Sequence, residues 1–338
     1  MTADSTGAVV PEIDPAKAAK KKRRKLLSRL LTVVVVAVVA VLFARSLSKN
    51  WSAVQAAHLH LSWLHVAAIV LFALAVPVSG VLWGSILNRL SDKGAHVGPL
   101  QSMAVHDLSW LLKYVPGQIG SVLSKVTWGQ RNGFPRTLIL ITFIYENVFL
   151  QIASIVPSAI ILILAIGPTL VENNALTVVG VVVVLVPLIA ILVPQIFHRI
   201  MSIASKRFLK SPLPEQYFLR PLQSLGFSAA YIAPRVINGI GFILCAASVT
   251  AITPGQWLPL AAAYALAGAI GILIIFVPSG IGVREAVLYV CLVGLGIDGG
   301  QAVIISVLSR LLSTVADAVI ALQYGALRLT LPKGPSVS

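Results

Sequence analysis

Long apolar segments are the feature that most restricts how this chain of 338 residues can fold. Hydrophobic residues make up 57% of the chain and charged residues only 11%, against about 25% charged in ordinary soluble domains. A helix needs about 20 mostly apolar residues to cross a bilayer. We therefore predict an all-α polytopic membrane protein with spans at Leu26–Ala44, Leu64–Leu87, Leu138–Ile166, Ala175–Ile196, Leu225–Ala251, Gln256–Val277 and Gln301–Tyr324.

Two apolar regions are interrupted by similar motifs, Val-Pro-Gly-Gln-Ile-Gly at 115–120 and Pro-Ser-Gly-Ile-Gly-Val-Arg-Glu at 278–285. Proline removes a backbone donor and glycine tolerates unusual conformations, so each motif should stop a helix. Backbone groups exposed in this way need polar partners inside lipid. Matched interruptions in the two halves of a membrane chain are typical of transporters that bind substrate between pseudo-symmetric repeats.

Basic residues dominate the charge, which is +15 in total, and their placement predicts the topology. Lys17 and residues 20–25 precede the first span, so residues 1–25 should form a disordered basic arm in the cytosol, attracted to anionic lipid rather than to nucleic acid. Further basic clusters at 89–93, 125–136 and 199–220 should also face the cytosol. We expect a multi-pass protein of the cell (plasma) membrane with both termini cytosolic.

These constraints predict two re-entrant or broken helical hairpins. Residues 101–124 must enter from the cytosol and return, because both flanking segments are basic. Residues 256–296 would enter from the opposite side, although 257–277 and 283–296 could instead be separate crossings. If residues 256–296 form a hairpin that enters from the opposite side, the two halves of the chain form an inverted-repeat helical bundle. Its membrane domain would cover 26–328, with repeat one at about 60–166, repeat two at about 222–326 and a cytosolic tail at 329–338.

Charged residues at bilayer depth are costly and are therefore candidates for a binding site. Glu146 and Arg310 occupy similar positions after the two motifs, and we expect them to face each other or to form a structural ion pair. Asp317 lies on roughly the same helix face as Arg310, with Ser313 or Thr314 near enough to satisfy its carboxylate.

Arg284 and Glu285 directly follow the second interruption. A helix that begins at Val283 would direct its free amides toward an anion, and Arg284 would add a planar guanidinium suited to phosphate. Glu285 either belongs to the site or stabilises the helix start. The full set of predicted substrate-binding residues is Arg284, Glu285, Arg310, Glu146, Gly280, Gly282, Pro116, Gly117, and, at the cytosolic mouth, Lys125 and Arg131.

The sequence gives little support for a disulfide, a metal site or a catalytic site. Cys245 and Cys291 lie in apolar stretches, which disfavours a disulfide or a thiol metal site. His106 and Asp107 are adjacent, so they should not face one another on a helix. We find no nucleotide-binding, zinc or hydrolase motif and predict no cofactor, no metal and no enzymatic activity.

The two motifs resemble those of the lysylphosphatidylglycerol synthase transmembrane-region family, a flippase-like membrane domain. The second block, Pro-x-Gly-x-Gly-x-Arg-Glu at 278–285 leading to Arg310, carries most of the resemblance, which spans about 30–325. The first block differs, because Ser121 and Asn147 stand where the family has an acid and an arginine. No synthetase domain follows the membrane part, so the chain resembles the stand-alone form.

The resemblance implies translocation of an anionic or glycosylated lipid between leaflets, flippase- or scramblase-like, with the headgroup in a polar cavity at the repeat interface. The expected partner is a membrane phospholipid or glycolipid, together with a separate lipid-modifying synthase. The alternative is a membrane glycosyltransferase, or its accessory subunit, acting with polyprenyl-phosphate-linked sugars. Glu285 is the best candidate for the carboxylate that such an enzyme needs.

Overall fold

The computed structural model describes residues 62–91, 96–114, 119–173, 215–273 and 282–331. This part of the chain is helical throughout and contains no strand. Its elements, in chain order, are α3 (Trp63–Leu90), α4 (Pro99–Leu111), η1 (Leu112–Tyr114), α5 (Ile119–Arg131), α6 (Arg136–Asn173), η3 (Glu215–Tyr217), α9 (Pro221–Ala230), α10 (Ile232–Ala247), α11 (Pro254–Leu273), α12 (Val283–Gly294) and α13 (Gly299–Thr330).

Five helical segments in the described part are long and apolar enough to cross a membrane. They are α3, the first part of α6, α9 joined to α10, α11, and α13, and each contains one of the predicted spans or most of it. The all-α polytopic membrane class is therefore confirmed. The predicted spans at 26–44 and 175–196, the basic arm at 1–25 and most of the tail lie outside the described residues.

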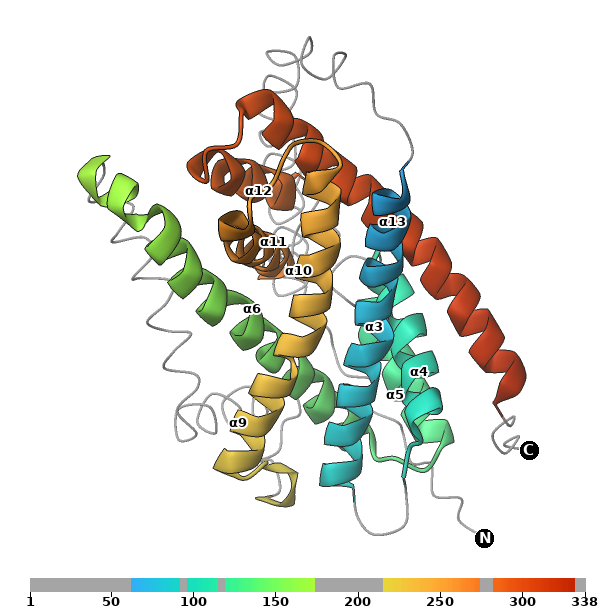
Figure 1. Ribbon diagram of the computed structural model, residues 1–338. Helices are drawn as coiled ribbons and strands as arrows, with labels where there is room; N and C mark the ends of the chain where they lie inside the picture. Colours follow the sequence, from blue (N-terminus) through green and yellow to red (C-terminus); the bar gives the residue numbers. More distant parts are fainter. Residues whose placement is uncertain (1–61, 92–95, 115–118, 174–214, 274–281, 332–338) are drawn as a thin grey trace, which may run out of the picture.

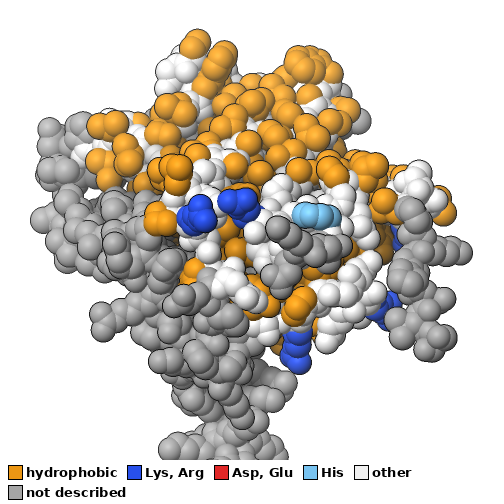
Figure 2. Space-filling view, turned by 90° about the horizontal axis from the view of Figure 1, so that it is seen from below, with side chains coloured by type: hydrophobic (Ala, Val, Ile, Leu, Met, Phe, Trp, Pro, Cys, Tyr) orange, Lys and Arg blue, Asp and Glu red, His pale blue; other side chains and the backbone are white. Residues whose placement is uncertain are grey.

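The outer surface fits a lipid environment. Large apolar side chains stand exposed around the bundle, among them Leu222, Val290 and Leu322 with 80%, 67% and 75% of their surface accessible. A soluble protein rarely leaves so much contiguous apolar surface uncovered. Figure 2 shows how apolar side chains dominate one part of the surface, while Lys and Arg side chains gather on the face seen from below.

That basic face is where several helices meet. In Figure 1, α3, α5, α4, α6 and α9 all have an end at the bottom of the molecule. Arg89 lies in the last turn of α3, Arg131 ends α5, Arg136 begins α6 and Arg220 precedes α9. This clustering agrees with the predicted placement of these residues on one side of the membrane.

The first interrupted region forms a pair of short helices. The helices α4 and α5 have 13 residues each and pack against one another. At about 1.5 Å per residue each is about 20 Å long, too short for a hydrocarbon core of about 30 Å. Both have their outer ends on the basic face (Figure 1). This geometry suits the predicted re-entrant hairpin, whose motif residues Pro116 and Gly117 lie outside the described residues.

The second interrupted region pairs α11 with α12. Gly282 has a φ of +83°, a conformation that glycine adopts without strain, and it comes directly before α12. With 12 residues α12 is about 18 Å long, which favours a hairpin over two separate crossings. Gly280 lies outside the described residues. The re-entrant hairpins and the inverted repeat themselves stay predictions.

Two apolar clusters hold the bundle together. One joins α3, α10 and α11 through stacked rings of Phe72, Tyr264 and Phe242, with centroids 5.3 and 4.7 Å apart along the stack. The other joins α3, α5 and α6 around Trp83 and Tyr145. Both clusters place α3 at the centre, with α6 and α13 running obliquely to it (Figure 1).

Candidate functional site

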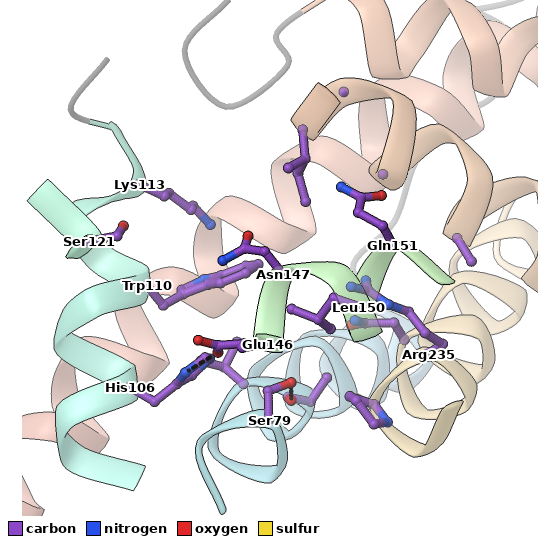
Figure 3. Close-up of a pocket in the computed structure, with 18 of the residues that line it drawn as sticks. Ser79, His106, Trp110, Lys113, Ser121, Glu146, Asn147, Leu150, Gln151 and Arg235 are labelled. Atoms are coloured by element: carbon purple, nitrogen blue, oxygen red, sulfur yellow. Dashed lines mark hydrogen bonds and ion pairs between the residues drawn. The ribbon is translucent and has the colours of Figure 1, made fainter. Parts of the chain in front are cut away.

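A cavity of about 650 Å³ lies within the described part of the bundle. It is lined from both interrupted regions: by Lys113 and Ser121, which flank 115–118, and by Ile272, Leu273 and Arg284, which flank 274–281. Described residues next to or at the end of each motif therefore border one shared space. Figure 3 shows the Lys113 and Trp110 side chains reaching toward this space from the α4–α5 pair, with Arg235 on the other side.

A buried ionic cluster forms part of the wall. Glu146 of α6 binds two groups from α4 and α5: Lys125 Nζ of α5 on one carboxylate oxygen, and His106 Nδ1 of α4 at 2.9 Å on the other. Lys125 Nζ lies 3.2 Å from His106 Nδ1 and 4.4 Å from the centroid of the Trp83 ring. Glu146 and Lys125 are only 2% and 1% exposed. This cluster ties α4, α5 and α6 together at one point.

A second ionic contact lies beside the start of α12. Glu285 accepts a hydrogen bond from the Gly282 backbone N–H at 2.6 Å, which caps the helix, and its other oxygen lies 3.7 Å from Arg310 Nε. The carboxylate thus stabilises the helix start and also holds Arg310 of α13. Of the two roles predicted for Glu285, the structural one is observed directly.

The third ionic contact joins the two halves of the chain. Asp317 of α13 accepts hydrogen bonds from Lys113 Nζ and Trp110 Nε1, each at 2.8 Å. Both donors belong to the segment just before the first interruption. The predicted partners Ser313 and Thr314 were wrong, because their hydroxyls donate instead to the Arg310 backbone carbonyl.

Two arginines of the cavity differ from the other cations. In the described residues neither Arg235 of α10 nor Arg284 of α12 forms an ion pair with a carboxylate. The Arg284 guanidinium lies over the Tyr264 ring, 4.4 Å from its centroid. Arg235 Nε is buried and finds no hydrogen-bond partner there. Both side chains line the cavity, so both are able to meet a ligand.

Several sequence predictions need correction here. Glu146 and Arg310 line the same cavity but do not pair with each other, since each has a nearer partner. Lys125 is not a solvated cation at the cytosolic mouth, because it is fully buried against Glu146. Arg131 lies exposed at the end of α5 and does not line the cavity.

Sequence reasoning missed Arg235, Lys113, Trp110 and His106. Arg235 lies inside the apolar run 225–251, so the rule that flags charges at bilayer depth could have found it. Lys113 and Trp110 stand three and six residues ahead of Pro116, and their closeness to the interruption was a usable signal. His106 was considered only with Asp107, whereas its partners are Glu146 and Lys125.

Asp107 itself is fully buried and does not line the cavity, and both its carboxylate oxygens lack a hydrogen-bond partner in the described residues.

The described residues were also compared with the requirements of a metal site. No group of three or more His, Cys, Asp or Glu side chains in the described part of the chain could hold a metal ion. Cys245 and Cys291 are free thiols.

Comparison with protein families gives a match over most of the chain. The family described as the lysylphosphatidylglycerol synthase TM region matches residues 30–321, which include the segments that border the cavity. A comparison with curated proteins found no match. Because the family match covers far more than half of the 338 residues, the chain belongs to the family of lysylphosphatidylglycerol synthase transmembrane regions.

Proposed function

We propose that this protein moves an anionic or glycosylated lipid between the two leaflets, with the polar headgroup in the cavity and the tails in the bilayer. The observation that carries the proposal is the shared cavity, which collects cations from both interrupted regions inside an otherwise apolar bundle. Charged side chains inside a membrane bundle are costly, and those that occur commonly mark the path of a polar substrate. Membership of a family of membrane domains agrees with this function.

The cavity also has a suitable size and lining. Its volume of about 650 Å³ lies within the range of about 300–1,000 Å³ that is typical of pockets for small ligands. Apolar residues such as Phe72, Val76 and Ile155 line the cavity beside the charged groups. A headgroup and the first part of its tails would therefore both find matching surfaces.

The rival function, a glycosyltransferase or its accessory subunit, needs a carboxylate that can act on a substrate. Glu285 was the predicted candidate, but its two oxygens are held by the Gly282 N–H and by Arg310. This engagement favours transport over catalysis. A separate lipid-modifying synthase remains part of the proposal as the source of the lipid, and the basic face marks the proposed cytosolic side of the plasma membrane.

Reconstitution into vesicles tests the proposal. Vesicles that contain the full-length protein and a headgroup-labelled lipid are treated with a membrane-impermeant quencher, and the labelled lipid reaching the outer leaflet is followed over time. We expect the protein to speed this movement and Arg284→Ala to slow it at least about tenfold, because a charged hydrogen bond contributes about 1.5–3 kcal/mol. Arg136→Gln, an exposed cation away from the cavity, is the matched control.

If vesicles with the wild-type protein exchange lipid no faster than empty vesicles, transport is the wrong function. Normal transport by Arg284→Ala would instead remove Arg284 from the binding site. Recovery of each variant from the membrane at wild-type yield shows that insertion is intact.

A further inference from the structure

The charges around the cavity do not balance. Five cations line it, Lys113, Lys125, Arg235, Arg284 and Arg310. Three carboxylates offset them: Glu146 with Lys125, Asp317 with Lys113, and Glu285 with Arg310. Arg235 and Arg284 are left without a carboxylate partner in the described residues. Both side chains are half-buried, and the buried Arg235 Nε has no acceptor in the described residues, so this surplus favours an anionic ligand.

No further carboxylate lines the cavity among the residues that the structure describes. The interrupted segments 115–118 and 274–281 contain no charged residue, and the predicted spans 26–44 and 175–196 contain no Asp or Glu. Asp107 does not line the cavity. A bound ligand is the source of negative charge that this lining favours.

The two arginines are arranged to share one ligand. They come from different helices, α10 and α12, and both contribute to the wall of the cavity. The Arg284 guanidinium lies 4.4 Å from the centroid of the Tyr264 ring, which also lines the cavity. Guanidinium groups form paired hydrogen bonds with phosphate oxygens, and the buried Arg235 Nε still lacks an acceptor.

Resting on the proposed function, we propose that Arg235 and Arg284 together bind a dianionic phosphate group, the phosphomonoester or diphosphate head of a lipid. A phosphomonoester carries a charge of roughly −1.5 to −2 at pH 7, which matches two arginines. A phosphodiester headgroup carries a single negative charge and leaves one arginine uncompensated. A headgroup esterified with lysine carries two ammonium groups and one phosphodiester, so its net charge is positive and it should bind more weakly to this pair of arginines.

Binding to the purified full-length protein in a neutral detergent tests this assignment. The probes are dioctanoyl phosphatidic acid, dioctanoyl phosphatidylglycerol, its lysyl ester and inorganic phosphate, and the dissociation constant of each is measured at pH 7. We expect phosphatidic acid to bind at least about tenfold more tightly than phosphatidylglycerol, because one charged hydrogen-bonding contact is worth about that factor. The lysyl ester should bind more weakly still.

Arg235→Gln and Arg284→Gln should each remove most of the preference for phosphatidic acid over phosphatidylglycerol, whereas Arg136→Gln should leave it intact. Arg235→Lys and Arg284→Lys keep the charge but lose the planar fork, so they should retain part of the preference. These two variants also keep the test valid if a glutamine variant does not fold as a monodisperse protein.

Equal affinity for phosphatidic acid and phosphatidylglycerol, or a preference that both glutamine variants retain, would overturn the inference. Inorganic phosphate that binds as tightly as phosphatidic acid would also overturn it, since the site would then serve free phosphate. Failure here is distinct from failure of the proposed function. Vesicles that move lipid without any charge preference refute only the two-arginine site, while selective binding without movement refutes only transport.

Discussion

Removing both Lys125 and Glu146 should cost less stability than the sum of the losses from removing each alone, because the two groups form a buried ion pair. Lys125→Met keeps the length of the side chain but leaves Glu146, 2% exposed, with only His106 as partner. Glu146→Gln leaves the Lys125 ammonium buried without a counter-charge. Removing one member of a buried ion pair costs about 3–5 kcal/mol, and we expect each single variant to lose about that much stability.

The double variant Lys125→Met/Glu146→Gln contains no unpaired charge at this point. Its loss of stability should therefore be smaller than the sum of the single losses by about 2–3 kcal/mol, the upper part of the range for residues in direct contact. The coupling energy is thus the quantity that the structure predicts.

The assay is reversible unfolding in mixed micelles, followed by tryptophan fluorescence as the fraction of denaturing detergent rises. Arg328→Met, an exposed cation near the end of α13, is the control and should change the free energy of unfolding by less than about 0.5 kcal/mol. Strictly additive losses in the double variant would refute the reasoning, because the two groups would then not stabilise one another.

Two further predictions concern glycines. Gly84→Ala should destabilise the protein by about 1–3 kcal/mol in the same unfolding assay, because the added Cβ would lie 2.5 Å from Ser102 Cβ and push α3 away from α4. The control is Gly325→Ala, which has open space around it. Equal stability of the two variants would contradict this packing. Gly282→Ala should lower the free energy of unfolding by roughly 1–2 kcal/mol, because Gly282 has a φ of +83°. The same variant should weaken lipid binding, because it displaces Arg284. An unchanged dissociation constant would show that the start of α12 is not part of the site.

The helices were largely predictable from the sequence, and the reason is hydropathy. An apolar run such as 138–166 has no stable place except as a helix in lipid, so its length and composition fix both its type and its approximate bounds. The short helices α4, α5 and α12 followed from the proline and glycine motifs that separate them. The bounds of these elements differ from prediction by up to seven residues where the chain is described, as at the end of α6.

The charge pairs were not predictable in the same way. Lys125 and Glu146 are 21 residues apart, and Trp110 and Asp317 are 207 apart, so their contacts depend on how helices pack. Position along a helix gives depth in the membrane but not the direction of the side chain toward a partner. The sequence therefore indicated that Glu146 and Arg310 share a region, and only the packing showed that they bind different residues.

The central claim is that a lipid headgroup occupies the cavity bordered by both interrupted regions. The most direct measurement is a cryo-electron microscopy map of the full-length protein in nanodiscs that contain phosphatidic acid. We predict density for a phosphate group within hydrogen-bond distance of Arg235 and Arg284, continuous with tails that leave toward the bilayer. Lipid density confined to the outer surface, with the cavity closed by side chains, would contradict the claim.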